Sequence, residues 1–152
     1  MATQSTPMPD DVRLPIYAVF SEAKQAAAAG DHARAEQLCE DAWGRIPEPK
    51  FGWDVTYVCL GAFVKYMGAS RSYDKPIEAV NAYLGSPYYA EYQDGPYFWL
   101  GSLYYEKGDL ARAFEYFERA NAMSKGRCFV EEDPRYKAFF RTCKTRPKQQ
   151  PS

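Results

Sequence analysis

Residues 108–120 read GDLARAFEYFERA, and residues 30–42 read GDHARAEQLCEDA. Seven of the thirteen aligned positions are identical, and four of these seven are Gly or Ala. A segment that recurs within one chain is typical of folds built from stacked repeats, in which every repeat is one supersecondary unit. The recurrence therefore predicts that at least two parts of the chain fold in the same way.

The size and composition of the chain are those of a globular protein. It has 152 residues, of which 46% are hydrophobic and 26% are charged, which suits a single buried core. Polar, proline-bearing ends at 1–11 and 144–152 predict disordered termini around one helical domain at 12–143. The start lacks the pattern of a secretory signal, and no run of about 18 apolar residues is present. We therefore expect a cytoplasmic protein without a membrane partner.

Apolar residues recur at helical spacing along almost the whole chain, so the sequence predicts an all-α fold. Gly30 suits the left-handed position after a helix and Asp31 can cap the next helix, and the same pair turns the chain again at 108–109. Asp74 and Asp133 are expected to cap two later helices. The expected helices cover about 14–29, 32–46, 53–67, 74–84, 96–107, 110–124 and 134–143.

The later copy of the repeated segment belongs to a longer pattern. Its positions are Tyr97, Leu100, Gly101, Tyr104, Gly108, Asp109, Ala113, Phe117 and Ala120. This spacing resembles the tetratricopeptide (TPR) repeat, in which a Gly-Asp turn joins two antiparallel helices. Gly101 and Ala113 are small, which allows the paired helices to approach each other closely.

Two further stretches carry parts of the same pattern. Residues 16–47 are similar through Gly30, Asp31, Ala35, Ala42 and Pro47, with Val19, Ala23 and Ala26 as departures. The middle copy keeps Tyr57, Leu60 and Gly61, followed by an irregular turn and Pro76 in place of Ala. The resemblance covers about 14–125 and implies a TPR-like α-solenoid of three helix-turn-helix pairs, closed by a C-terminal capping helix.

The resemblance also implies a site, because TPR superhelices bind proteins on a concave face built mainly from the first helix of each pair. Mapped onto this sequence, the groove-facing positions are Tyr17, Phe20, Lys24, Val58, Ala62, Lys65, Tyr66, Phe98, Ser102 and Tyr105. Phe20 and Lys24 stand where the TPR subclass that clamps chaperone carboxylates has Lys and Asn, which disfavours that partner. The aromatic character of the set favours an apolar partner element framed by acidic residues, and the alternative is that several of these residues pack internally.

The sequence shows no pattern for catalysis, a cofactor or a metal. His32, the only histidine, is expected in an exposed turn without an identifiable nucleophile beside it. The acidic residues 131–133 directly precede Pro134, which favours helix capping over acid–base chemistry. The cysteines lack the grouping of a zinc site, and Cys39 and Cys59 fit small core positions as reduced thiols. We therefore expect a non-enzymatic protein with no cofactor and no metal.

Positive charge gathers towards the C-terminus. Residues 119–152 contain nine basic and three acidic residues, whereas residues 1–118 contain ten basic and seventeen acidic residues. Four aromatic residues lie between 129 and 140, so one interpretation of this segment is RNA binding by phosphate contacts and base stacking. We favour the alternative that the aromatic residues close the last repeat while the cations line its solvated side.

Together these features favour a small interaction module that binds, and by binding inhibits, a protein partner such as a toxin. In size and fold it is similar to small immunity proteins that neutralise toxins. The alternative is a chaperone or adaptor for a secreted or regulatory protein. Nucleic acid ranks below both as a partner.

Overall fold

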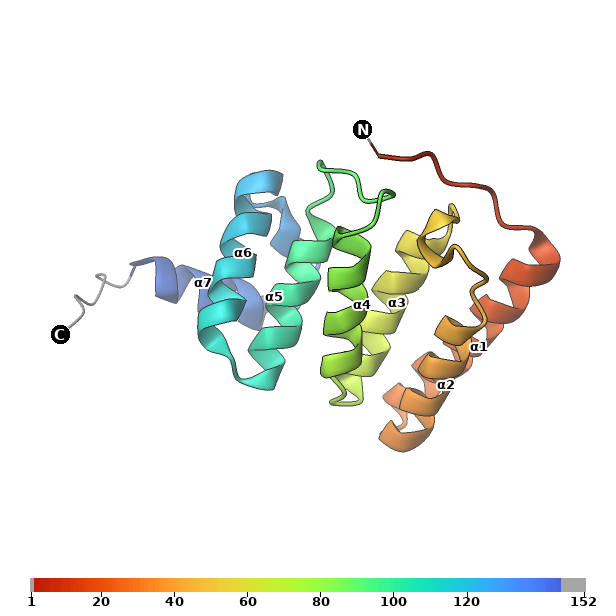
Figure 1. The fold of residues 1–152 in the computed structure, drawn as a ribbon. Helices are drawn as coiled ribbons and strands as arrows, with labels where there is room; N and C mark the ends of the chain where they lie inside the picture. Colours follow the sequence, from red (N-terminus) through yellow and green to blue (C-terminus); the bar gives the residue numbers. More distant parts are fainter. Residues whose placement is uncertain (1, 146–152) are drawn as a thin grey trace. The chain divides into compact units, whose positions relative to one another are not determined.

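A computed structural model of the chain describes residues 2–145, and this part is all-helical, with seven α-helices and no strand (Figure 1). The helices are α1 (Asp10–Ala28), α2 (His32–Gly44), α3 (Thr56–Ala69), α4 (Asp74–Leu84), α5 (Gly95–Lys107), α6 (Leu110–Ser124) and α7 (Pro134–Thr145). Two short 3-10 helices, η1 (Lys50–Gly52) and η2 (Arg127–Phe129), lie in the connections. The chain divides into two compact units: residues 1–91, with α1 to α4, and residues 92–152, with α5 to α7. The all-α prediction is confirmed.

The first unit is organised around α3. Helix α1 packs along α2, and α3 packs against α1, α2 and α4. The side chains without exposed surface in this unit include Cys39, Leu60, Met67 and Val80, together with Ala23, Ala35 and Ala42. Alanine at the contacts between the helices lets their backbones come close, and the larger apolar residues fill the space beside these contacts.

The repeated Gly-Asp pair forms the same turn in both units. Gly30 has a φ of +79° and Gly108 a φ of +95°, in the left-handed region that favours glycine. The Asp31 carboxylate accepts a hydrogen bond of 3.3 Å from the backbone N–H three residues later, and Asp109 accepts the equivalent bond of 3.2 Å. Each aspartate therefore caps the next helix, as predicted for Asp31.

The N-terminal segment, expected to be disordered over 1–11, is hydrogen-bonded to the first unit in the structure. Thr6 exchanges two backbone hydrogen bonds, of 2.8 and 2.9 Å, with residues 52–54. The side chain of Met8 is 5% exposed, and its backbone N–H donates to the Asp54 carboxylate at 3.0 Å. The disorder expected for this segment rested on its polar composition. Composition does not indicate whether the backbone groups of a segment form hydrogen bonds with another part of the chain.

Helix α1 begins at Asp10, four residues before its expected start at Leu14. Asp10 and Asp11 lie in the first turn, where their carboxylates interact favourably with the positive end of the helix dipole. Pro15 consequently lies inside the helix.

Two other expectations concern helix ends. Asp74 is the first residue of α4 and not its cap, so the predicted N-cap at this position is wrong; the cap residue is Tyr73, whose side chain makes no capping hydrogen bond. Asp133 accepts the backbone N–H of Arg135 at 2.9 Å, which confirms the predicted cap of α7. Of the expected tail at 144–152, Lys144 and Thr145 end α7 and the other residues lie outside the described part.

An aromatic core holds the second unit together. Helix α5 packs along α6, and η2 and α7 also pack against α6. The ring of Phe117 has no exposed surface, and its centroid lies 5.4 Å from that of Phe98 and 5.5 Å from that of Phe129. A Cβ atom added at Gly101 would stand 2.5 Å from Phe117 Cδ1. The small size of Gly101 is therefore what admits Phe117 between α5 and α6, as the repeat pattern predicts.

Tyrosine and arginine side chains stack in a ladder along one edge of the hairpin that α5 and α6 form. The ring of Tyr116 stacks on Tyr104 at 5.6 Å, with 4° between the planes, and on Tyr97 at 6.4 Å, with 20° between the planes. The Arg112 guanidinium lies 5.6 Å from the centroid of Tyr104, and that of Arg119 lies 4.1 Å from the centroid of Tyr97. Each such cation–π contact contributes about 0.5–1 kcal/mol at an exposed site.

The contact between Gly101 and Phe117 makes a specific prediction about stability. Gly101→Ala should lower the free energy of unfolding by about 1–3 kcal/mol, because the added methyl group overlaps a ring that cannot move outward. The matched control is Gly44→Ala in α2, where nothing lies within 4 Å of the added Cβ. This control should leave stability unchanged or raise it by up to about 1 kcal/mol through helix propensity. Urea unfolding of both variants decides the matter, and an equal gain in both would contradict the packing argument.

Candidate protein-binding surface

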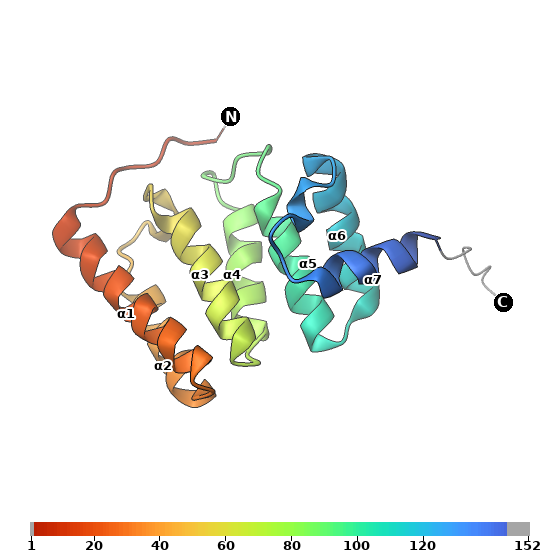
Figure 2. The same cartoon turned by 180° about the vertical axis from the view of Figure 1, so that it is seen from behind.

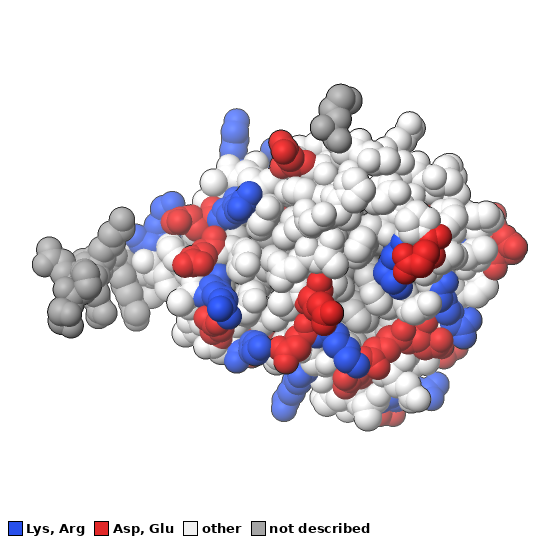
Figure 3. Space-filling view, in the orientation of Figure 1, with Lys and Arg blue, Asp and Glu red and all other residues white. Residues whose placement is uncertain are grey.

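The first unit exposes large apolar side chains on one side. Among residues 2–91, the exposed large apolar side chains on helices are Leu14 (55% exposed), Tyr17 (37%) and Val58 (63%). All three belong to α1 or α3, which pack against each other and lie in front of α2 and α4 in Figure 2. We call this surface the α1–α3 face, defined by these three residues with the exposed Lys24 and Lys65. The other side of the unit, formed by α2 and α4, carries interspersed acidic and basic side chains (Figure 3).

Tyr17 links the two helices of this face. Leu14 precedes it by three residues and so lies on the same side of α1. Burial and the nearby Cys59 and Asp54 raise the pKa of the Tyr17 phenol, while the charge of Arg13 opposes the shift. The Arg13 guanidinium lies 5.9 Å from the centroid of the Tyr17 ring. Tyr17 therefore lies next to the beginning of α3 and presents an aromatic surface that is partly covered by one cation.

Seven of the predicted partner-contacting residues lie in the first unit, and the structure distributes them unevenly. Tyr17, Lys24, Val58 and Lys65 are exposed, whereas Ala62 and Tyr66 are half-buried. Phe20 is only 5% exposed, so its side chain belongs to the core and not to a surface. The reason is helical register, since Phe20 lies on the buried stripe of α1 with Ile16 and Ala23. Leu14, which the repeat pattern did not single out, belongs to the exposed group.

The other three predicted residues lie on α5, in the second unit. Phe98 is 5% exposed, within the aromatic core. Ser102 is half-buried, and its hydroxyl donates to the carbonyl of Trp99 at 2.8 Å. The ring of Tyr105 meets two aromatic side chains of α7 edge-on, with centroid distances of 5.4 and 5.1 Å. Within this unit, α7 thus covers part of the α5 surface that the repeat pattern assigned to a partner.

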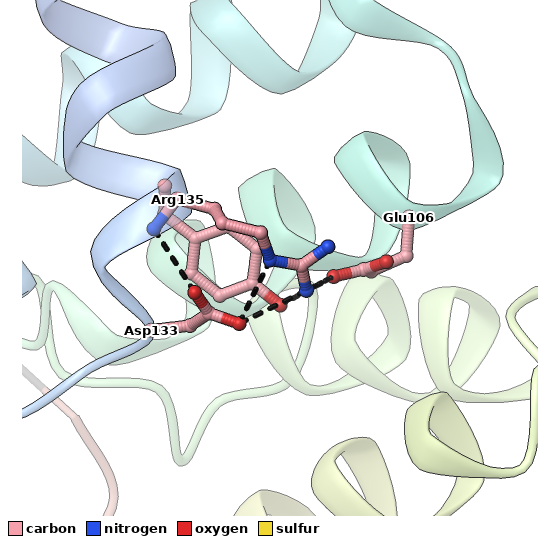
Figure 4. A network of polar contacts seen from close by, with 4 residues as sticks. Glu106, Asp133 and Arg135 are labelled. Carbon is pink, nitrogen blue, oxygen red and sulfur yellow. Dashed lines mark hydrogen bonds and ion pairs between the residues drawn. The ribbon is translucent and has the colours of Figure 1, made fainter.

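A polar network anchors the start of α7 (Figure 4). The Arg135 guanidinium donates to Glu106 of α5 at 2.8 Å and to the Asp133 carboxylate at 2.9 Å, and the Tyr136 hydroxyl donates to Glu106 at 3.0 Å. The hydrogen bonds from Arg135 hold the pKa of Asp133 below its usual range. Burial, followed by the charge of Glu106, raises the pKa of the Tyr136 phenol. The network holds α7 in the position from which it covers Tyr105.

The low pKa of Asp133 predicts a pH-dependent contribution to stability. A carboxyl group whose pKa is lower in the folded state stabilises the fold above its unfolded pKa, near 4, and loses this effect as the pH falls through the folded value. Asp133→Asn keeps the cap but removes the charge, so it should cost up to about 1 kcal/mol at neutral pH, the upper range for exposed ion pairs. At a pH below the folded pKa the cost should approach zero. Urea unfolding at both pH values tests this, and an equal cost at both would contradict it.

The groups able to do covalent or metal chemistry are dispersed or buried. Cys39 is 0% and Cys59 1% exposed, which confirms the prediction that they are core residues. Burial raises the pKa of the Cys39 thiol to about 12 and that of Cys59 to about 11. His32 is exposed. Within residues 2–145, no cluster of three or more His, Cys, Asp or Glu is placed to hold a metal ion, and no helix there has the length and apolar character to cross a membrane.

The buried thiols predict an order of reactivity. At pH 8 a thiol of pKa 12 is ionised in about one molecule in ten thousand, and only the thiolate reacts with iodoacetamide. Cys39 and Cys59 should therefore remain unmodified in the folded chain, while Cys143, which is half-buried, reacts first. Peptide mass spectrometry after timed labelling measures this order, with labelling in urea as the control in which all four cysteines react. Labelling of Cys39 at the rate of Cys143 would contradict the buried placement.

Comparison of the chain with protein-family models, with curated proteins and with solved structures finds no match. The candidate surface is therefore defined by its own geometry: an apolar centre on two contacting helices, with cations at its edge.

Proposed function

We propose that the chain is a non-enzymatic, TPR-like interaction module that binds a protein partner on the α1–α3 face of its first unit. The observation that carries the proposal is the exposure of Leu14, Tyr17 and Val58 on two helices that contact each other. Large apolar side chains that gather on a surface are typical of sites of protein contact, because leaving them in water costs free energy that association recovers.

The TPR-like part of the proposal has its own support. The hairpins formed by α1 with α2 and by α5 with α6 share the glycine in left-handed conformation and the capping aspartate. Both also bury alanines at matching repeat positions, because Ala35 and Ala42 in one and Ala113 and Ala120 in the other have no exposed surface. These are the positions that allow paired helices to nest in the repeat pattern.

The chemistry of the α1–α3 face favours a particular kind of partner segment. Its apolar centre suits aliphatic or aromatic side chains, which supply most of the affinity at interface hot spots. Lys24 and Lys65 at its edge, with Arg13 over Tyr17, favour acidic residues beside those side chains. Exposed charges at the edge contribute more to orientation and association rate than to affinity. We propose stoichiometric inhibition of the partner, as by an immunity protein, with a chaperone or adaptor role as the alternative that uses the same face.

RNA binding by the basic C-terminal segment draws less support. Phe129 and Phe140 are 6% and 5% exposed, and the rings of Tyr136 and Phe139 contact Tyr105. Aromatic side chains committed to packing are not available as platforms for bases. The contacts agree with the interpretation in which these residues close the end of a helical array.

A photo-crosslinking experiment tests the proposed surface. A crosslinking amino acid in place of Val58 should capture a protein from cells that produce the chain, because Val58 is the most exposed of the three apolar residues that define the face. The captured partner is then titrated calorimetrically against Tyr17→Ala and Val58→Ser. Each variant should weaken binding about tenfold or more, the effect expected of a truncated anchor residue.

The matched control is Asn81→Arg, since Asn81 is exposed on α4, away from α1 and α3. Far-ultraviolet circular dichroism should show equal helicity in all variants. Unchanged affinity in both Tyr17→Ala and Val58→Ser would remove the binding site from the α1–α3 face.

A further inference from the structure

The first unit also has a hollow between α2 and α4, away from the α1–α3 face. We call it the α2–α4 cleft; it has a volume of about 700 Å³, and its walls come from α2, from residues 48–51, from α3 and from α4. This volume is within the range of about 300–1,000 Å³ that is usual for ligand sites. The repeat pattern did not point to this surface, because it assigns partner contacts to the first helix of each pair.

The cleft stays open because small residues line part of its walls. Helices α2 and α4 each pack against α3 and leave a gap between them. Ala79 and Ala82 of α4 and Gly44 of α2 border that gap, and a Cβ added at Gly44 would meet nothing within 4 Å. An ion pair between Glu40 of α2 and Lys75 of α4 bridges the gap. The sequence thus provides walls without side chains long enough to fill the space between them.

The floor of the cleft is aromatic. The ring of Trp43 stacks on that of Phe63 at 5.0 Å, with 19° between the planes, and the ring of Phe51 lies 6.2 Å from Trp43. Phe63 is 2% exposed, while Trp43 and Phe51 are only half-buried. Trp43 and Phe51 therefore keep accessible ring surface inside a recess. An apolar side chain that inserts into such a recess is removed from water on several sides at once, which favours binding.

The charges around the cleft favour a basic occupant. Glu40, Glu48 and Glu78 line it against two lysines. Both lysines are engaged within the chain: Lys75 pairs with Glu40, and the Lys50 ammonium lies 4.8 Å from the centroid of Trp43 and donates to its carbonyl. Three glutamates thus face two lysines, an acidic excess of one charge, with Glu40 paired to Lys75 and Glu48 accepting the backbone N–H of Lys50 at 3.1 Å. Residues 1–91 as a whole have the same sign, with eight basic and twelve acidic residues, a net charge of −4.

We infer that the α2–α4 cleft binds a partner polypeptide segment that inserts a large apolar side chain and carries Lys or Arg beside it. The apolar side chain contacts Trp43 and Phe51, and the basic neighbours lie near Glu48 and Glu78. The acidic rim repels phosphate groups, which disfavours nucleic acid, and it repels the acidic segments that suit the α1–α3 face. This site is independent of the proposed function, because none of the residues that define the α1–α3 face lines the cleft and because it favours the opposite partner charge.

Matched peptides test the charge preference. The probes are two fluorescein-labelled synthetic peptides with the same Leu-Phe centre, one flanked by lysines and the other by glutamates. Fluorescence anisotropy with the full chain should show about threefold to tenfold tighter binding of the lysine-flanked peptide, the effect of two exposed charge pairs. Raising the salt concentration should reduce this preference, because exposed charges are screened. Equal affinities for the two peptides at low salt would overturn the inference.

Matched variants test the location. Ala82→Arg places a long cationic side chain in the cleft, whereas Asn81→Arg adds the same residue at the neighbouring exposed position of α4, which does not line it. Ala82→Arg should weaken binding of the lysine-flanked peptide about tenfold or more, and Asn81→Arg should have an effect of about threefold or less. Trp43→Ala should also weaken binding, and because it removes a packed ring, the exposed Ala82→Arg is the decisive variant.

Equal binding by Ala82→Arg and Asn81→Arg would overturn the assignment of the cleft. Tyr17→Ala should bind the lysine-flanked peptide like the unmodified chain. If Tyr17→Ala lost this binding and Ala82→Arg kept it, the peptide would occupy the α1–α3 face, and the cleft inference would fail while a binding site on that face would remain.

Discussion

The close approach of paired helices is the constraint on which the rest of the structure depends. In the second unit, Gly101 leaves only enough room for the ring of Phe117, which has no exposed surface. In the first unit, alanines without exposed surface occupy the corresponding contacts between α1 and α2. Helices packed this tightly have space between them for few large rings. In a chain that is 16% aromatic, many rings must therefore pack on a third element or remain at the surface.

In the first unit, this constraint places large residues on the two sides of a helical layer. On α1 and α3, apolar side chains protrude and lysines stand at the edge, whereas between α2 and α4 the rings are recessed and glutamates stand at the rim. The two surfaces thus differ in shape, one protruding and the other recessed, and in the charge at their edges. Under the two proposals, the unit discriminates between segments by repulsion as well as by attraction, since each surface disfavours the charge that the other accepts.

Much of the fold could be predicted from the sequence, because helix periodicity and the Gly-Asp turn are local signals. The exact start of α1 could not, since Pro15 and the pair Asp10–Asp11 favour different positions, and the tertiary contacts of residues 3–8, which precede the helix, are not visible in its local sequence. The site was harder to predict. Phe20 and Val58 both occupied groove positions of the repeat pattern, but one is buried and the other is 63% exposed, because exposure depends on the neighbouring helices. The α2–α4 cleft could not be predicted, because Gly44 and Ala82 come to line it only through the packing of α2 and α4 on α3, which no local pattern in the sequence reports.

The ladder of Tyr97, Tyr116 and Tyr104 between Arg119 and Arg112 has a thermodynamic consequence for the surface that it forms. A free arginine on a protein surface samples many rotamers, and each contact with another molecule must restrict that motion at a cost of about 0.5–1.5 kcal/mol per side chain. Here the guanidinium groups already rest on phenol rings in the isolated chain. These arginine side chains therefore lose their rotamer entropy when the chain folds. A molecule that contacts this edge of the hairpin does not have to restrict them again.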